Sequence, residues 1–107
     1  MNLHHLAEER SLAYHAVIAA RLEGDPSLLE VARHRVAEWV NAGTPHPHYS
    51  HAWSEILASP IAVIRSHLTD ASEKGRELRQ VTPFAGLVDA RERWKLWRQV
   101  RERYTGT

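Results

Sequence analysis

The sequence of 107 residues contains no cysteine. This absence excludes disulfide bonds, thiolate metal sites and cysteine nucleophiles. No apolar run approaches the roughly 18 residues that a membrane-spanning helix needs. Charged residues also interrupt the N-terminus before any apolar stretch that would serve as a signal peptide. We therefore expect a cytoplasmic protein that makes no contact with a membrane.

The sequence also lacks a strong excess of charge of either sign. It has 14 basic and 13 acidic residues, a net charge of +1, which does not by itself predict nucleic-acid binding. The distribution is uneven, however. From Arg91 to the end, six cations accompany only two acidic residues, Glu92 and Glu102. Any electrostatic function is therefore expected in this last part of the chain.

The alternating β-branched pattern of a β-strand is absent, and the five glycines are isolated, so no phosphate-binding loop is predicted. Residues 1–107 are expected to form a single domain. Its fold class is predicted to be all-α, a compact bundle of five to six helices with long first and last helices. The predicted helices cover residues 2–23, 26–43, 49–58, 61–67, 70–80 and 87–104.

Capping residues and prolines set these boundaries. Asp25-Pro26 and Ser59-Pro60 each place a capping side chain before a proline, a pattern typical of helix starts. Asp70 with Glu73 resembles a capping box, and Asp89 is a capping residue for the last helix. Gly43 is predicted to end the second helix. Two prolines within residues 44–48 predict a loop there. Apolar periodicity places Leu3 and Val40 on inward faces.

The last helix is the most informative segment. At about 100° per residue, its apolar side chains cover roughly half of the circumference, and Arg93 and Arg101 fall within that half. A buried guanidinium needs a carboxylate, carbonyl or phosphate partner. Tryptophan is enriched at protein interfaces, and Trp94 and Trp97 lie three residues apart. We therefore predict that Arg93, Trp94, Trp97 and Arg101 contact a protein partner, either a second copy or another protein.

Three histidines lie within six residues: His46, His48 and His51. Imidazole is a common zinc ligand. Two of the three, however, fall in the proline-rich loop and do not have the spacing of helical metal ligands. They are therefore interpreted as loop and cap residues and are weak metal candidates. No metal or cofactor is expected.

Arg10 and His15 match the Arg-x4-His signature of a class of helical bacterial ribonucleases. In that chemistry the histidine is a general base and the arginine holds the scissile phosphate. Residues five apart lie about 140° apart on a helix, so the match is the least favoured of three interpretations. A salt-bridged arginine and an exposed histidine are the expected alternative. No other nucleophile or carboxylate pair predicts catalysis, and the protein is not expected to be an enzyme.

Residues 61–81 are compatible with a helix-turn-helix motif, with a turn at Thr69-Asp70. Its second helix would present Lys74, Arg76 and Arg79 to phosphates and guanines. The glycine common in such turns is missing. Glu73 and Glu77 would also face the nucleic acid, a pattern more typical of a solvated, salt-bridged helix face. Nucleic-acid binding is therefore the alternative function.

The segments EERSLAYHAVIAARL, HPHYSHAW and RQVTPFAGLVDARERWKLWRQVR together resemble a family of small uncharacterised bacterial proteins. The resemblance extends over most of the chain. It implies genes next to toxin or nucleotidyltransferase partners and hence an antitoxin-like role, and it brings no catalytic residues. The predicted function is a non-catalytic protein-interaction module that acts through its last helix.

Overall fold

The structure is a computed structural model that describes residues 3–104. The predicted all-α class is confirmed, because this range contains six helices and no strand. The helices are α1 (Leu3–Arg21), α2 (Ser27–Ala42), α3 (Pro47–Leu57), α4 (Ile61–Leu68), α5 (Glu73–Gln80) and α6 (Ala90–Tyr104). With 19 residues, α1 is the longest, as predicted, but the 16 residues of α2 exceed the 15 of α6.

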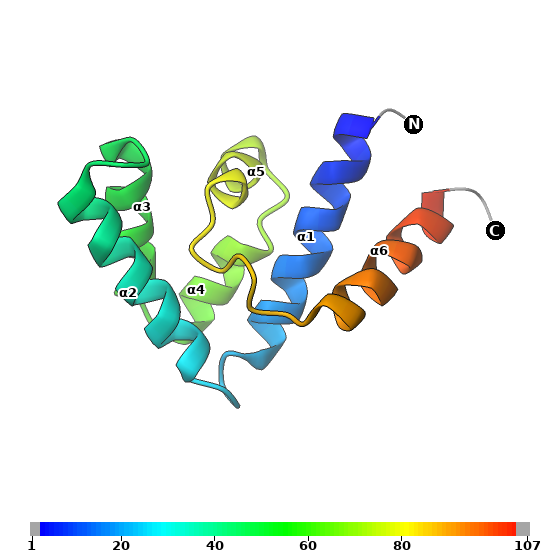
Figure 1. The fold of residues 1–107 in the computed structure, drawn as a ribbon, viewed down its shortest axis with the longest axis horizontal. Coiled ribbons are helices and arrows are strands. Elements are labelled where there is room, and N and C mark those ends of the chain that lie inside the picture. Colours follow the sequence, from blue (N-terminus) through cyan, green and yellow to red (C-terminus); the bar gives the residue numbers. More distant parts are fainter. Residues whose placement is uncertain (1–2, 105–107) are drawn as a thin grey trace.

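Figure 1 shows α1 between the α4 and α5 helices on one side and α6 on the other, with the α2–α3 pair beyond α4 and α5. On one side α1 contacts α4 and α5, and α6 packs along it on the other. The α2 and α3 helices form a neighbouring pair, which is joined to the rest through contacts between α3 and α4. The last helix thus lies at one edge of the molecule, with α1 as its main support.

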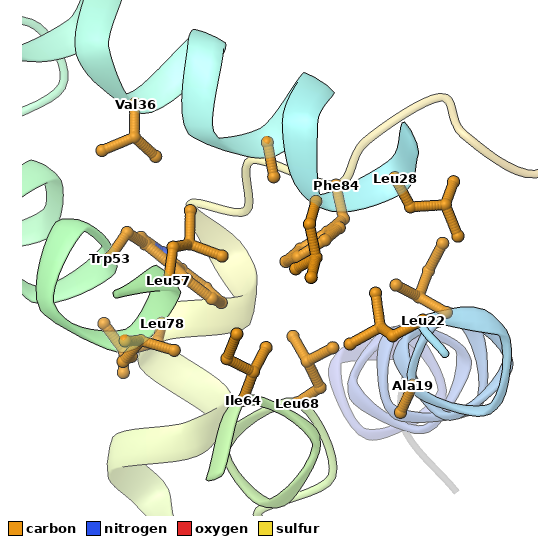
Figure 2. Close-up of a cluster of buried hydrophobic side chains, with 14 of the residues drawn as sticks. Ala19, Leu22, Leu28, Val36, Trp53, Leu57, Ile64, Leu68, Leu78 and Phe84 are labelled. Carbon is orange, nitrogen blue, oxygen red and sulfur yellow. The ribbon is translucent and has the colours of Figure 1, made fainter. Parts of the chain in front are cut away.

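The hydrophobic core is centred on two aromatic rings (Figure 2). Trp53 and Phe84 meet edge to face, with their ring centroids 6.1 Å apart, a favourable geometry for an aromatic pair. Aliphatic side chains from α1 to α5 surround them, among them Leu22, Leu57 and Ile64. Phe84 is fully buried although it belongs to the connector between α5 and α6. This connector is therefore part of the core.

Two predicted helix ends are confirmed by their capping contacts. Gly43 ends α2 in the left-handed conformation (φ 73°), and its N–H donates to the carbonyl of Trp39. Asp89 precedes α6, and its Oδ1 accepts the backbone N–H of Glu92 at 2.9 Å. Both contacts satisfy backbone groups that a helix end leaves unpaired.

Other predicted caps and boundaries are wrong, although α4 begins at Ile61 as predicted. Ser59 does not cap α4, because its hydroxyl donates back to the carbonyl of Glu55 in α3. The cap of α5 is Ser72, whose Oγ accepts the N–H of Gly75, whereas Asp70 accepts the N–H of Ser72. The first helix ends at Arg21, two residues earlier than predicted, and the last begins at residue 90 instead of 87.

The predicted loop at residues 44–48 is shorter than expected. The α3 helix begins within it, at Pro47, because Nδ1 of His46 accepts the N–H of His48 at 3.1 Å. Leu3 and Val40 were predicted to point inward but are 84% and 47% exposed. Each lies near the end of its helix, where the periodic pattern continues beyond the packed region.

The contact between α5 and the preceding turn depends on Gly75. A Cβ atom at this position would lie 2.1 Å from the backbone oxygen of Asp70, far inside van der Waals contact. The same oxygen accepts a hydrogen bond from Arg79 at 2.5 Å. The absence of a side chain at residue 75 thus allows α5 to approach closely enough for Arg79 to bond to the turn.

Candidate functional site

A groove of about 410 Å³ lies between α1 and α6, with the connector to α6 at its base. Arg10, Ser11, Tyr14 and His15 contribute from α1, and Arg93 and Trp97 from α6. The remaining lining residues are Ala7, Arg79, Thr82, Ala85 and Gly86. The groove thus brings together side chains from three helices and one connector, and three of these side chains are arginines.

Arg10 lies against the aromatic wall of the groove. Its guanidinium carbon is 5.9 Å from the centroid of the Trp97 ring, within cation–π range. The Trp97 ring meets the Tyr14 ring at a centroid distance of 6.5 Å. The Nε of Arg10 is buried and has no hydrogen-bond partner. A buried donor without a partner costs about 1–3 kcal/mol, so this N–H is available to an acceptor that enters the groove.

Arg79 is 3% exposed, and it is the residue through which α5 contributes to the groove. Its Nη1 donates to the carbonyl oxygens of Leu68, at 3.4 Å, and Asp70, at 2.5 Å. Burial lowers the pKa of the guanidinium, and the Asp70 carboxylate partly opposes this shift. The two carbonyls hold Arg79 in place through one of its three nitrogens.

His15 is buried between α1 and the connector. Its Nδ1 lies 2.7 Å from the carbonyl oxygen of Ser11 and its Nε2 lies 2.8 Å from the hydroxyl of Thr82. Because a carbonyl only accepts, Nδ1 carries the proton and Nε2 accepts from Thr82. Burial lowers the pKa of His15 to about 4, and the Arg79 guanidinium acts in the same direction. The imidazole is therefore neutral at pH 7.

The connector at the base of the groove is fixed from both sides. The Tyr14 hydroxyl donates to the carbonyl of Phe84 at 2.5 Å and accepts the N–H of Leu87 at 3.0 Å. From α2, Arg35 donates to the carbonyls of Pro83 and Ala85, at 3.0 and 2.6 Å. The groove is thus bordered by a firmly held backbone, a suitable basis for a binding site.

The Arg-x4-His pair lies in this groove, although the two residues do not have the arrangement that catalysis requires. A general base needs a free lone pair within reach of the substrate proton. In His15 the proton of Nδ1 and the lone pair of Nε2 are both in hydrogen bonds within the protein. The expected alternative, a salt-bridged Arg10 and an exposed His15, is also wrong, because His15 is buried and Arg10 forms no ion pair within residues 3–104.

The four residues predicted to contact a partner are divided between two faces of α6. Trp97 and Arg93 are half-buried and line the groove. Trp94 is 64% exposed and Arg101 is exposed as well. Arg91, Trp94, Arg98 and Arg101 follow one another at intervals of three and four residues, the spacing of a single helix face. We call these four exposed residues the outer stripe of α6.

The three cations predicted to bind nucleic acid are likewise not on one surface. Lys74 and Arg76 are exposed on α5, and Arg76 lies 3.9 Å from the carboxylate of Glu8 in α1. Arg79 is buried in the groove and bonded to carbonyls. A recognition helix would present all three cations outward, and this arrangement presents two.

The three neighbouring histidines have separate environments. His46 caps α3, His48 lies 3.9 Å from Glu77, and His51 is exposed on α3. Within residues 3–104 no three histidine or acidic side chains come together as a group suited to a metal ion. His46 is a cap residue, as interpreted, whereas His48 lies within α3 and not in the predicted loop.

No protein-family model matches the chain, and comparisons with curated proteins and with solved structures find no match either. Across the helices of residues 3–104, none has both the length and the apolar character that crossing a membrane requires. The groove and the outer stripe of α6 are therefore the two features of the described residues that suggest a binding function.

The sequence indicated two of the groove's arginines but not that they lie in one groove. Arg10 and Arg93 both fall on predicted apolar faces, where a cation is unusual. Nothing in the spacing indicates that the two faces meet each other, or that Arg79 and Thr82 join them. The groove depends on tertiary contacts between residues as far apart in the sequence as Ala7 and Trp97, and periodicity does not encode such contacts.

Proposed function

We propose that this protein is a non-catalytic interaction module that binds an acidic surface of a partner protein through the outer stripe of α6. The observation that carries the proposal is the 64% exposure of Trp94 next to Arg91 and Arg98. Burial of an exposed tryptophan ring against a partner is energetically favourable. Tryptophan and arginine are also among the residues most enriched in binding hot spots.

The charge of the stripe favours a different protein over a second copy as the partner. Symmetric dimers bring the same patch of both subunits together. Such a contact would place Arg91, Arg98 and Arg101 opposite their own copies, and like charges at an interface are unfavourable. An acidic surface would pair with them. Neutralisation of a toxin by an antitoxin is one function of this kind, and it is the one that the sequence resemblance suggests.

Absence of catalysis is supported by the environment of His15. Its two nitrogens are committed to Ser11 and Thr82, and its lowered pKa makes it a poor base near neutral pH. The proposal therefore assigns the α6 stripe to binding and assigns no reaction to the groove.

Affinity capture with the full chain from its native cell, followed by a measured dissociation constant for the captured protein, tests the proposal. Trp94→Ala is expected to weaken binding by about thirtyfold or more, as for a hot-spot tryptophan. Val40→Ala is the matched control, because Val40 is also an exposed apolar side chain but lies on α2. Light scattering of the free protein should give a monomer.

The proposed role of the arginine charges in binding can be tested separately through the association rate. Arg98→Glu is expected to slow association and to reduce the dependence of the association rate on salt. Equal binding by wild type and Trp94→Ala, or a stable dimer that Trp94→Ala dissociates, would overturn the proposal of an acidic partner at the outer stripe.

A further inference from the structure

The groove between α1 and α6 is lined by positive charge and by no carboxylate. Three guanidiniums line it, those of Arg10, Arg79 and Arg93, and no carboxylate is among the lining residues. Within residues 3–104, neither Arg10 nor Arg93 has a recorded ion pair. Asp70, Glu8 and Glu9 act on Arg79 electrostatically without lining the groove.

One donor among the lining side chains has no hydrogen-bond partner. Arg10 Nε is buried and unbonded, whereas Arg79 uses only Nη1 for its recorded bonds to the α4–α5 turn. Guanidinium groups offer forked donors that match the oxygens of phosphate or carboxylate. His15 adds no charge at neutral pH, so the three guanidiniums give the lining side chains a charge of about +3. A dianionic ligand balances this charge better than a monoanionic one.

The rest of the lining is small or aromatic. Ala7, Ala85 and Gly86 leave room beside the Trp97 ring, and the volume of about 410 Å³ lies within the usual range of sites for small organic ligands. An inorganic ion would leave most of this space unused. The lining thus fits an organic molecule that ends in a doubly charged group.

We propose that this groove binds a small phosphate monoester, whose phosphate lies among Arg10, Arg79 and Arg93 and whose organic part lies along the wall formed by Trp97 and the small residues. The site lies along the side of α6 that packs against α1, whereas Trp94 is 64% exposed and does not line it. It does not depend on the partner proposed above, so the two proposals can fail separately.

Isothermal titration with adenosine 5′-monophosphate tests the proposal, with adenosine and sulfate as reference compounds. The monophosphate is expected to bind, and to bind at least tenfold more tightly than either reference. Arg93→Ala should weaken its binding by about tenfold or more, because it removes a charge-assisted contact. Arg98→Ala removes the same charge from the outer stripe of α6 and should leave the affinity within about twofold, as expected for a screened, distant charge.

A second readout does not depend on affinity. The NMR signal of the Arg10 Nε–H should move downfield on addition of the monophosphate, because this donor acquires its first acceptor. Equal affinity for the monophosphate and sulfate, equal loss in Arg93→Ala and Arg98→Ala, or an unchanged Nε–H signal at saturation would each overturn the proposal. Partner capture by Arg93→Ala at the wild-type level would show that such a failure concerns the groove alone.

Discussion

One face of α6 turns toward α1 and the other toward solvent, and each carries a tryptophan with arginines. On the inner face, Trp97 lies against Tyr14 and Arg10, and Val100 is fully buried. On the outer face, Trp94 is 64% exposed among cations. Tryptophan and arginine are thus packed against α1 on the inner face and exposed to solvent on the outer face. The inner residues should determine stability and the groove, whereas the outer residues should affect neither.

The largest expected effect concerns His15, which belongs to the inner surface. Its pKa falls from 6.5 in the unfolded chain to about 4 in the folded protein. Above pH 6.5 both states are neutral at this residue and its stabilising contribution is complete. As the pH falls from 6.5 to 4, His15 becomes protonated in the unfolded chain but remains neutral in the folded protein. The free energy of unfolding should therefore decrease by up to about 3 kcal/mol over this interval.

Urea unfolding at several pH values measures this loss. His15→Gln should be less stable at pH 7 and should lose less stability on acidification, whereas the control His51→Gln, at an exposed position on α3, should follow the wild type. Asp70 does not obscure the interval, since its pKa is lowered from an ordinary value of 3.8. An identical pH dependence in His15→Gln and wild type would show that the inner surface does not hold a neutral imidazole.

A smaller difference is expected between the two tryptophans. Trp97→Ala removes a half-buried ring from contact with Tyr14 and should lower the free energy of unfolding by about 2 kcal/mol, less than the 3–5 kcal/mol of a fully buried aromatic residue. Trp94→Ala should change it by less than about 0.5 kcal/mol, as for most surface substitutions. Thermal or urea unfolding gives both values, and similar losses in the two variants would contradict the distinction between the faces.

The sequence was sufficient to predict that α6 exists but not how it packs. Asp89 was identified as its cap although the predicted range began three residues too early, and the apolar periodicity identified a helix that docks. The periodicity also placed Trp94 and Arg101 in an apolar half of the circumference. In the structure only α1 provides substantial cover, and one helix shields a narrower strip than half a circumference. The width of the buried stripe on a helix depends on how many other elements pack against it. The periodicity of that helix alone does not give this number.

The connector shows a second limit. Residues 82–86 have the proline and glycine of a loop, and a loop is what they form. The burial of Pro83 and Phe84 was not predictable from composition, because it depends on Tyr14 and Arg35, which bond to the connector backbone from two different helices. Similarly, Asp70 and Ser72 are both capping residue types near the start of α5. Only the closeness of Gly75 to the turn decides that Ser72 is the cap.

The smallest expected effect concerns the ion pair that joins α6 to α1 outside the groove. Arg21 Nη2 and Glu92 Oε2 form a salt bridge in which both side chains are more than 40% exposed. An exposed pair is screened by solvent and contributes at most about 1 kcal/mol. In a double-mutant cycle of Arg21→Ala and Glu92→Ala, the coupling energy should therefore be below this value and should shrink in 1 M salt. A coupling as large as the loss in Trp97→Ala would mean that charge, and not the inner apolar face, holds α6 against α1.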